Sequence, residues 1–160
     1  MSPLSMEEID RMEGGIMLAL STFRRSEEAI DYAVNKSRES KKLMIVHVVD
    51  VNVARYVIGM GGEFVEGLKE SCETEILSKS EKEAGEHVAA IIQKAEALGI
   101  EVKSLNQVGR FAEVCLAVVK QIKPSMVVTT RSQRPAWVKK FFGSPVYELI
   151  QKAGCPVIAI

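Results

Sequence analysis

The fold is decided by residues 126–160, which open with Met126-Val127-Val128-Thr129-Thr130 and close with Val157-Ile158-Ala159-Ile160. Both runs are apolar enough to be buried strands. Between them lie a polar, basic loop, the helix-start signal Gly143-Ser144-Pro145 and a turn at Ala153–Pro156. Strand, loop, capped helix and strand in this order predict an α/β fold of the nucleotide-binding type.

Three further strands precede this stretch. Ile16–Leu20 and Leu43–Val49 are continuously apolar, as expected of parallel strands that are buried on both faces. Ile100–Val108 is more polar, which predicts a strand at the edge of the sheet. Helices are predicted between the strands and before the first one: at Met6–Met12, from Glu27 onward, over a long region from about Glu63 to Leu98, at Phe111–Ile122 and at Pro145–Lys152.

Local signals indicate where several of these helices begin and end. Ser5-Met6-Glu7-Glu8 fits a capping box, and Ser26 can cap a helix that begins at Glu27. Gly99 is a natural helix stop. The helix before it is expected to dock through a stripe of apolar residues on one face: Val88, Ile91, Ile92, Ala95 and Leu98.

The alternation of strands and helices predicts the topology. Strands separated by helices pair in parallel through right-handed crossovers. We therefore predict a doubly wound parallel α/β sheet of five strands in the order 3-2-1-4-5, formed by one domain at residues 15–160 after an arm at residues 1–14. Ligands bind such sheets beyond the carboxyl ends of the strands, where the order reverses. The loops Ser21–Arg25 and Arg131–Phe142 are expected to face each other there.

Composition limits the function classes. The 160 residues are 47% hydrophobic and carry no formal net charge, so bulk electrostatics give no case for nucleic acid or a membrane surface. Each apolar run is shorter than the roughly 20 residues of a membrane helix, and the N-terminal residues are too acidic for a signal peptide. Cys72, Cys115 and Cys155 are far apart in the sequence. This spacing indicates free thiols, which are typical of proteins in a reducing cytoplasm. We expect a cytoplasmic protein.

The chain resembles the universal stress protein family from Ile16 to Ile160. The resemblance is carried by the first strand with its capped helix, by His47-Val48-Val49-Asp50, and by the tail from Gly143-Ser144-Pro145-Val146 to Cys155-Pro156-Val157. It implies an adenine nucleotide alpha hydrolase-like fold and a role in the stress response. It also implies ATP or another adenine nucleotide as the cofactor, and homodimers formed by antiparallel pairing of the last strand.

Three positions depart from the family's nucleotide motif. Members that bind nucleotides carry G-x-x-G-x9-G-[ST] after the fourth strand, and alignment on Gly143-Ser144 puts Thr130 and Gln133 at the earlier glycines. Ser21 stands where the family tends to have an aspartate. Glycine lets the backbone approach a phosphate and adopt positive φ, whereas Thr130 is β-branched. The sequence therefore predicts weak or absent ATP binding.

The residues expected at a ligand site come from both loops and the neighbouring strand: Ser21, Thr22, Val48, Thr130, Arg131, Gln133, Gly143 and Ser144. Side chains could replace the missing glycine amides, because a basic cluster falls in the same loops: Arg24, Arg25, Arg131, Arg134, Lys139 and Lys140. Solvated loop charge is the alternative for this cluster, and a simple helix cap is the alternative for Ser144. No catalytic or metal motif is recognised, so we expect a protein that is not an enzyme.

Two hypotheses follow. The first is a regulatory protein of the stress response that holds a nucleotide or another phosphorylated ligand in a degenerate site. The second is a homodimeric interaction module of the same fold that binds no nucleotide. Val157–Ile160 is predicted at a sheet edge, where an exposed apolar strand invites pairing with a second chain. The alternative at this edge is cover by the arm Met1–Met12.

Overall fold

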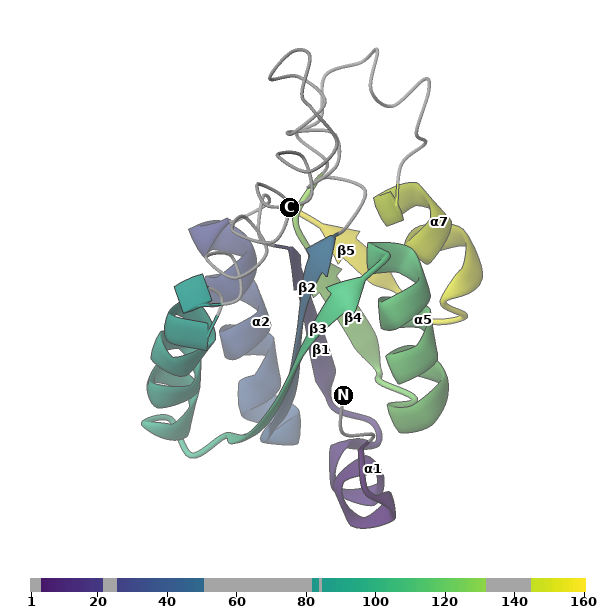
Figure 1. Cartoon of the computed structure of the whole chain (residues 1–160). Coiled ribbons are helices and arrows are strands. Elements are labelled where there is room, and N and C mark those ends of the chain that lie inside the picture. Colours follow the sequence, from purple (N-terminus) through teal and green to yellow (C-terminus); the bar gives the residue numbers. More distant parts are fainter. Residues whose placement is uncertain (1–3, 22–25, 51–81, 84, 132–144) are drawn as a thin grey trace.

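Five parallel strands form one sheet in this protein. The computed structural model describes residues 4–21, 26–50, 82–83, 85–131 and 145–160. Within them the strands are β1 (Ile16–Ser21), β2 (Lys42–Asp50), β3 (Glu101–Gly109), β4 (Met126–Thr129) and β5 (Val157–Ala159). Their order is β3-β2-β1-β4-β5 and every pairing is parallel, which confirms the predicted α/β topology (Figure 1).

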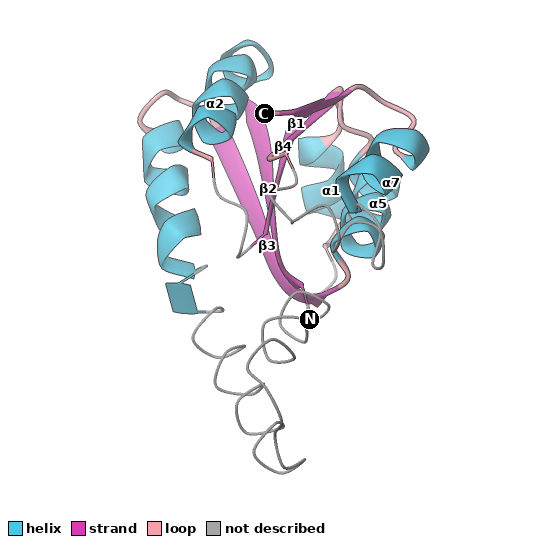
Figure 2. Cartoon of the chain, turned by 90° about the horizontal axis from the view of Figure 1, so that it is seen from above, coloured by secondary structure: helices cyan, strands magenta, loops and turns pink. Residues whose placement is uncertain are grey.

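Helices cover both faces of the sheet. The described helices are α1 (Met6–Met12), α2 (Glu27–Ser40), α5 (Phe111–Ile122) and α7 (Pro145–Lys152), together with helical residues 82–83 and 85–96. Figures 1 and 2 show α2 and the helix of residues 85–96 on one face, and α1, α5 and α7 on the other. This arrangement gives three layers, with the sheet in the middle.

The central strand β1 divides the core in two. All six of its residues are buried. Met17 and Ala19 belong to the core on the α5 face, whereas Leu18 and Leu20 belong to the core on the α2 face. Because side chains alternate along a strand, a strand that is buried on both faces must be apolar throughout. The apolar run of β1 therefore follows from its central place in the sheet.

The predicted helix signals are mostly found in the structure. Ser26 Oγ accepts a hydrogen bond from the Ala29 N–H at 3.2 Å and caps α2. In the docking stripe, Val88, Ile91 and Ala95 are buried as predicted, but Leu98 is 44% exposed. The structure corrects this last residue because the α-helix ends at residue 96 and the chain turns at Gly99, which has φ +76°. Leu98 thus lies beyond the periodic face.

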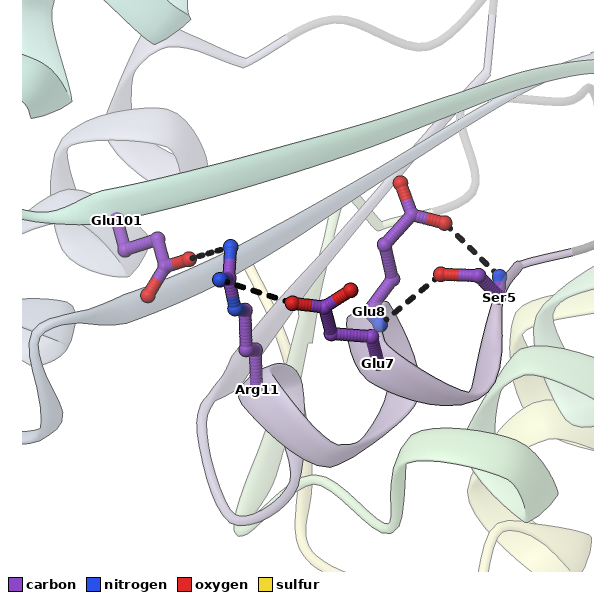
Figure 3. A network of polar contacts seen from close by, with 5 residues as sticks. All are labelled: Ser5, Glu7, Glu8, Arg11 and Glu101. Carbon is purple, nitrogen blue, oxygen red and sulfur yellow. Dashed lines mark hydrogen bonds and ion pairs between the residues drawn. The ribbon is translucent and has the colours of Figure 1, made fainter.

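The N-terminal arm is held by local and long-range contacts. The Ser5 N–H donates to Glu8 Oε2 at 2.9 Å, and Ser5 Oγ accepts from the Glu8 N–H at 3.2 Å, which completes the predicted capping box (Figure 3). Hydrogen bonding of the Glu8 carboxylate to Ser5, first to its backbone N–H and then to its side chain, lowers the pKa of Glu8. Arg11 forms ion pairs with Glu7 at 3.1 Å and with Glu101 of β3 at 3.7 Å (Figure 3).

A glycine pair joins the arm to β1. Gly14 has φ +77°, a conformation that favours glycine. A Cβ atom on Gly15 would lie 2.7 Å from the Cβ of Lys42, so only glycine fits against β2 at this point.

The arm packs on α5 and β2. Strands β1 and β4 separate β2 from β5. The described part of the arm therefore does not cover β5, contrary to the alternative raised from the sequence.

Met12 anchors the arm, and replacing it should show how much the arm stabilises the domain. Its side chain is 1% exposed in the core on the α5 face. We expect Met12→Ala to lower the free energy of unfolding by about 2–4 kcal/mol, because it removes buried methylene groups and leaves a cavity. The matched control is Met6→Ala in the same helix, where the side chain is 75% exposed and the expected change is within about 0.5 kcal/mol. Urea unfolding of both variants measures the difference, and equal effects would contradict the anchoring role.

Candidate functional site

The carboxyl ends of the central strands meet at the switch point of the sheet, which is the place where the strand order reverses. Ser21 ends β1 and pairs in register with Val48 of β2. On the other side of β1, Ala19 pairs with Thr129 of β4. The structure therefore places Ser21, Val48 and Thr130 at one end of the sheet. In an open α/β sheet this is the end at which ligands bind.

Two buried hydroxyl groups at this end have no hydrogen-bond partner within the described part of the chain. They are Ser21 Oγ and Thr130 Oγ1, on residues that are 1% and 2% exposed. The neighbouring Thr129 differs, because its Oγ1 donates to the Ala19 carbonyl at 2.9 Å. A buried hydroxyl without a partner costs about 1–3 kcal/mol. The two hydroxyls are thus the polar groups that a ligand or water at this end could satisfy.

The two hydroxyls belong to opposite faces of the sheet. Ser21 continues the alternation of Met17 and Ala19, so it lies on the α5 face together with its neighbour Val48. Val128 lies on the α2 face, and the ladder continues past β4 because the Arg131 N–H donates to the Ile160 carbonyl at 2.8 Å. Thr130 therefore keeps an extended geometry and lies on the α2 face, like Val128. One ligand could satisfy both hydroxyls only by spanning the strand ends.

Arg131 is held at β5. Its Nε donates to the Ala159 carbonyl at 3.3 Å, in addition to the bond from its backbone N–H to Ile160. The guanidinium group therefore lies toward the edge of the sheet. As placed, Arg131 does not supply the charge between β1 and β4 that its position after β4 suggested. The sequence offered no signal for this contact, because it depends on an acceptor 28 residues away.

Four of the expected site residues lie outside the described residues: Thr22, Gln133, Gly143 and Ser144. The same is true of the other basic residues of the two loops: Arg24, Arg25, Arg134, Lys139 and Lys140. Within the described ranges, no group of three or more histidine, cysteine, aspartate or glutamate side chains could hold a metal ion. In the same ranges, no helix is both long and apolar enough to cross a membrane.

A hollow of about 250 Å³ lies elsewhere, between α5 and the edge strand β3. Its lining includes the apolar residues Leu4, Leu105 and Val118 and the charged residues Arg110 and Glu113. These two charged groups form an ion pair of 3.5 Å. The hollow is separated from the carboxyl ends of β1 and β4, so it is not part of the site described above.

A parallel sheet whose strand order reverses beside the first strand defines the class of doubly wound α/β proteins. Within that class, the chain matches the model of the universal stress protein family over residues 14–160. The chain therefore belongs to the universal stress protein family. The matched region begins after α1, so the helix of the arm precedes the part that the family shares.

Solved structures agree with this assignment of the fold. The universal stress protein UspA from Lactobacillus plantarum is 17% identical and has a TM-score of 0.68, with 92% of this chain and 98% of that chain covered. A family protein from Arabidopsis thaliana with AMP bound is 15% identical, with a TM-score of 0.55 and coverage of 91% and 90%. A universal stress protein in complex with cAMP is 13% identical, with a TM-score of 0.56 and coverage of 92% and 97%. No curated protein sequence matches the chain.

The residues present fit the family's nucleotide motif poorly. Positive φ among described residues other than glycine occurs only at Lys41 and Lys123, so Thr130 does not adopt the conformation for which a glycine would be needed. Its side chain is also larger than that of glycine and is buried. Ser21 places a neutral hydroxyl where an aspartate would supply a charge. What this end of the sheet offers is hydrogen bonding by hydroxyl groups.

Paired substitutions at the end of β4 test whether the Thr130 hydroxyl is unsatisfied in the free protein. Thr130→Val removes a buried hydroxyl without a described partner, so we expect the free energy of unfolding to rise by about 1 kcal/mol. Thr129→Val is the matched control, because it removes a hydroxyl that is bonded to the Ala19 carbonyl and should lower the free energy of unfolding by about 1 kcal/mol. Denaturant unfolding without ligand measures both, and a loss of stability in Thr130→Val would show that its hydroxyl is satisfied.

Proposed function

We propose that this chain is a cytoplasmic regulatory protein of the stress response that binds a small phosphorylated ligand in a degenerate nucleotide site. The observation that carries the proposal is the pair of buried hydroxyls, on Ser21 and Thr130, at the switch point of the sheet. Buried polar groups are normally hydrogen-bonded, so groups that lack a partner among the described residues at this end of the sheet favour a ligand. Cysteines that are far apart in the sequence agree with free thiols in a cytoplasmic protein.

The ligand class we propose is an adenine nucleotide with few phosphates. The two family structures with AMP and with cAMP support this choice. ATP is the poorer candidate, because Thr130 and Gln133 replace the glycines that would let backbone amides surround several phosphates. Ser21 also lacks the carboxylate that a phosphate-bound Mg²⁺ would use. For the same reason, we propose binding without catalysis.

A titration with ATP, ADP, AMP and cyclic AMP tests the ligand class. We expect ATP to bind more weakly than micromolar at physiological salt and AMP to bind more tightly than ATP. Calorimetry measures the affinities, and fluorescence of Trp137, the only tryptophan, gives a second readout. ATP affinity at micromolar or tighter would contradict the proposal.

Variants at the strand ends test whether the hydroxyls contact the ligand. Ser21→Ala and Thr130→Val should each weaken AMP binding about threefold to tenfold, the effect of one lost hydrogen bond of about 1 kcal/mol. Ser104→Ala is the control, because Ser104 is an exposed serine on β3, away from the switch point. Equal affinity in all three variants would remove both hydroxyls from the binding site.

A homodimeric interaction module is the second candidate function, and the free edge of β5 supports it. β5 is the last strand of the sheet and pairs only with β4 among the described strands. Its three residues are half-buried, and α7 beside it exposes Tyr147 and Ile150. A half-buried apolar edge is a template for pairing with a second strand. We therefore propose antiparallel pairing of β5 with its copy.

Sedimentation measures this assembly. We expect a dimer with a dissociation constant of roughly micromolar or below. Val157→Pro should weaken it at least about tenfold, because proline removes one backbone donor from the edge and is tolerated at the first residue of an edge strand. Lys152→Ala on α7 is the control, and a chain truncated before Val157 should be monomeric. A wild-type chain that stays monomeric well above micromolar concentration would contradict the dimer.

A further inference from the structure

The backbone of β5 presents a short set of hydrogen-bonding groups to solvent. The Pro156 carbonyl accepts from the Val127 N–H at 2.9 Å, and the Ile160 N–H donates to the Thr129 carbonyl at 3.0 Å. Residues 156 and 160 thus direct their backbone groups toward β4. In a parallel ladder this direction alternates, so Ile158 also faces β4, whereas Val157 and Ala159 face the outer edge.

Arg131 occupies one of these outer groups. The outward carbonyl of Ala159 accepts the hydrogen bond from Arg131 Nε at 3.3 Å. Among the described residues, no hydrogen bond is formed by the N–H or carbonyl of Val157 or by the N–H of Ala159. A charged side chain laid across a sheet edge hinders pairing at that point. Within the described part of the chain, the edge is therefore open at Val157 and covered at the Ala159 carbonyl.

This difference bears on the register in which two copies of β5 can pair. In an antiparallel pair, residues whose groups face the partner exchange both N–H···O bonds. A two-fold axis at Ile158 would pair Val157 with Ala159 of the partner subunit, and half of the bonds would need the Ala159 carbonyl. An axis at Ala159 would need that carbonyl for both central bonds. An axis at Val157 forms both central bonds from Val157 alone.

We propose that Arg131 sets the register of the β5 dimer by covering the Ala159 carbonyl, so that the two-fold axis passes through Val157. The proposal rests on the β5 dimer proposed above and adds a specificity-determining residue to it. It assigns Arg131 to assembly, whereas its place after β4 suggested contact with a ligand. The partner is a second copy of this chain.

Cysteine cross-linking of the full chain distinguishes the registers. The background replaces Cys72 and Cys155 with serine and keeps Cys115, which is buried. With the axis at Val157, V157C faces itself across the interface at a Cα separation of about 5.5 Å, which suits a disulfide. I158C does not face itself in this register. We expect V157C to cross-link about tenfold faster than I158C, as for the loss of one or two hydrogen bonds.

Arg131→Ala completes the test. The substitution uncovers the Ala159 carbonyl. In this variant, the cross-linking rate of I158C should therefore rise about tenfold relative to that of V157C. Lys152→Ala is the control, because it removes a charge from α7, the helix that precedes β5. It should leave the ratio of the two cross-linking rates unchanged. Faster cross-linking of I158C with Arg131 in place, or a ratio that Arg131→Ala does not change, would overturn the register. Monomers in sedimentation without cross-links in any variant would instead reject the dimer itself.

Discussion

Pairing of β1 on both of its edges is the interaction on which the rest of the structure depends. Six residues of β1 pair with β2, and four pair with β4. The strand is buried on both faces, so it also separates and lines the two cores. The chain adds β2 and β3 on one side of β1 and then β4 and β5 on the other side. The strand order therefore reverses beside β1. The switch point, with Ser21 at its rim, is a direct result of this central position.

The topology and helix positions followed from the sequence because burial leaves a periodic trace. α5 and α7 begin and end at the predicted residues, since apolar residues recur there at helical spacing. The ends of β2 and β3 were less accurate. β2 runs from Lys42 to Asp50 and β3 ends at Gly109, each beyond the apolar run. Ladder hydrogen bonds join backbone groups and continue where the side chains are polar.

The candidate site was predictable only as far as strand ends determine it. Ser21, Val48 and Thr130 could be placed at one edge, because the ends of parallel strands coincide. The direction of a long side chain depends on an acceptor that the sequence does not name. Arg131 shows this, since its guanidinium contacts the Ala159 carbonyl of another strand. The separation of the two hydroxyls onto opposite faces depended on the ladder past β4, which the apolar pattern does not describe.

The docking of α1 has a consequence for the order of folding events. The arm precedes β1 in the chain, yet Met12 shares a core with residues of α5, and Arg11 pairs with Glu101 of β3. These partners are about ninety or more residues away, so closing the contacts costs loop entropy until the sheet has brought them near. We therefore expect the arm to dock after β2, β3 and α5 have assembled. Contacts that form this late slow the unfolding of a domain more than they speed its folding.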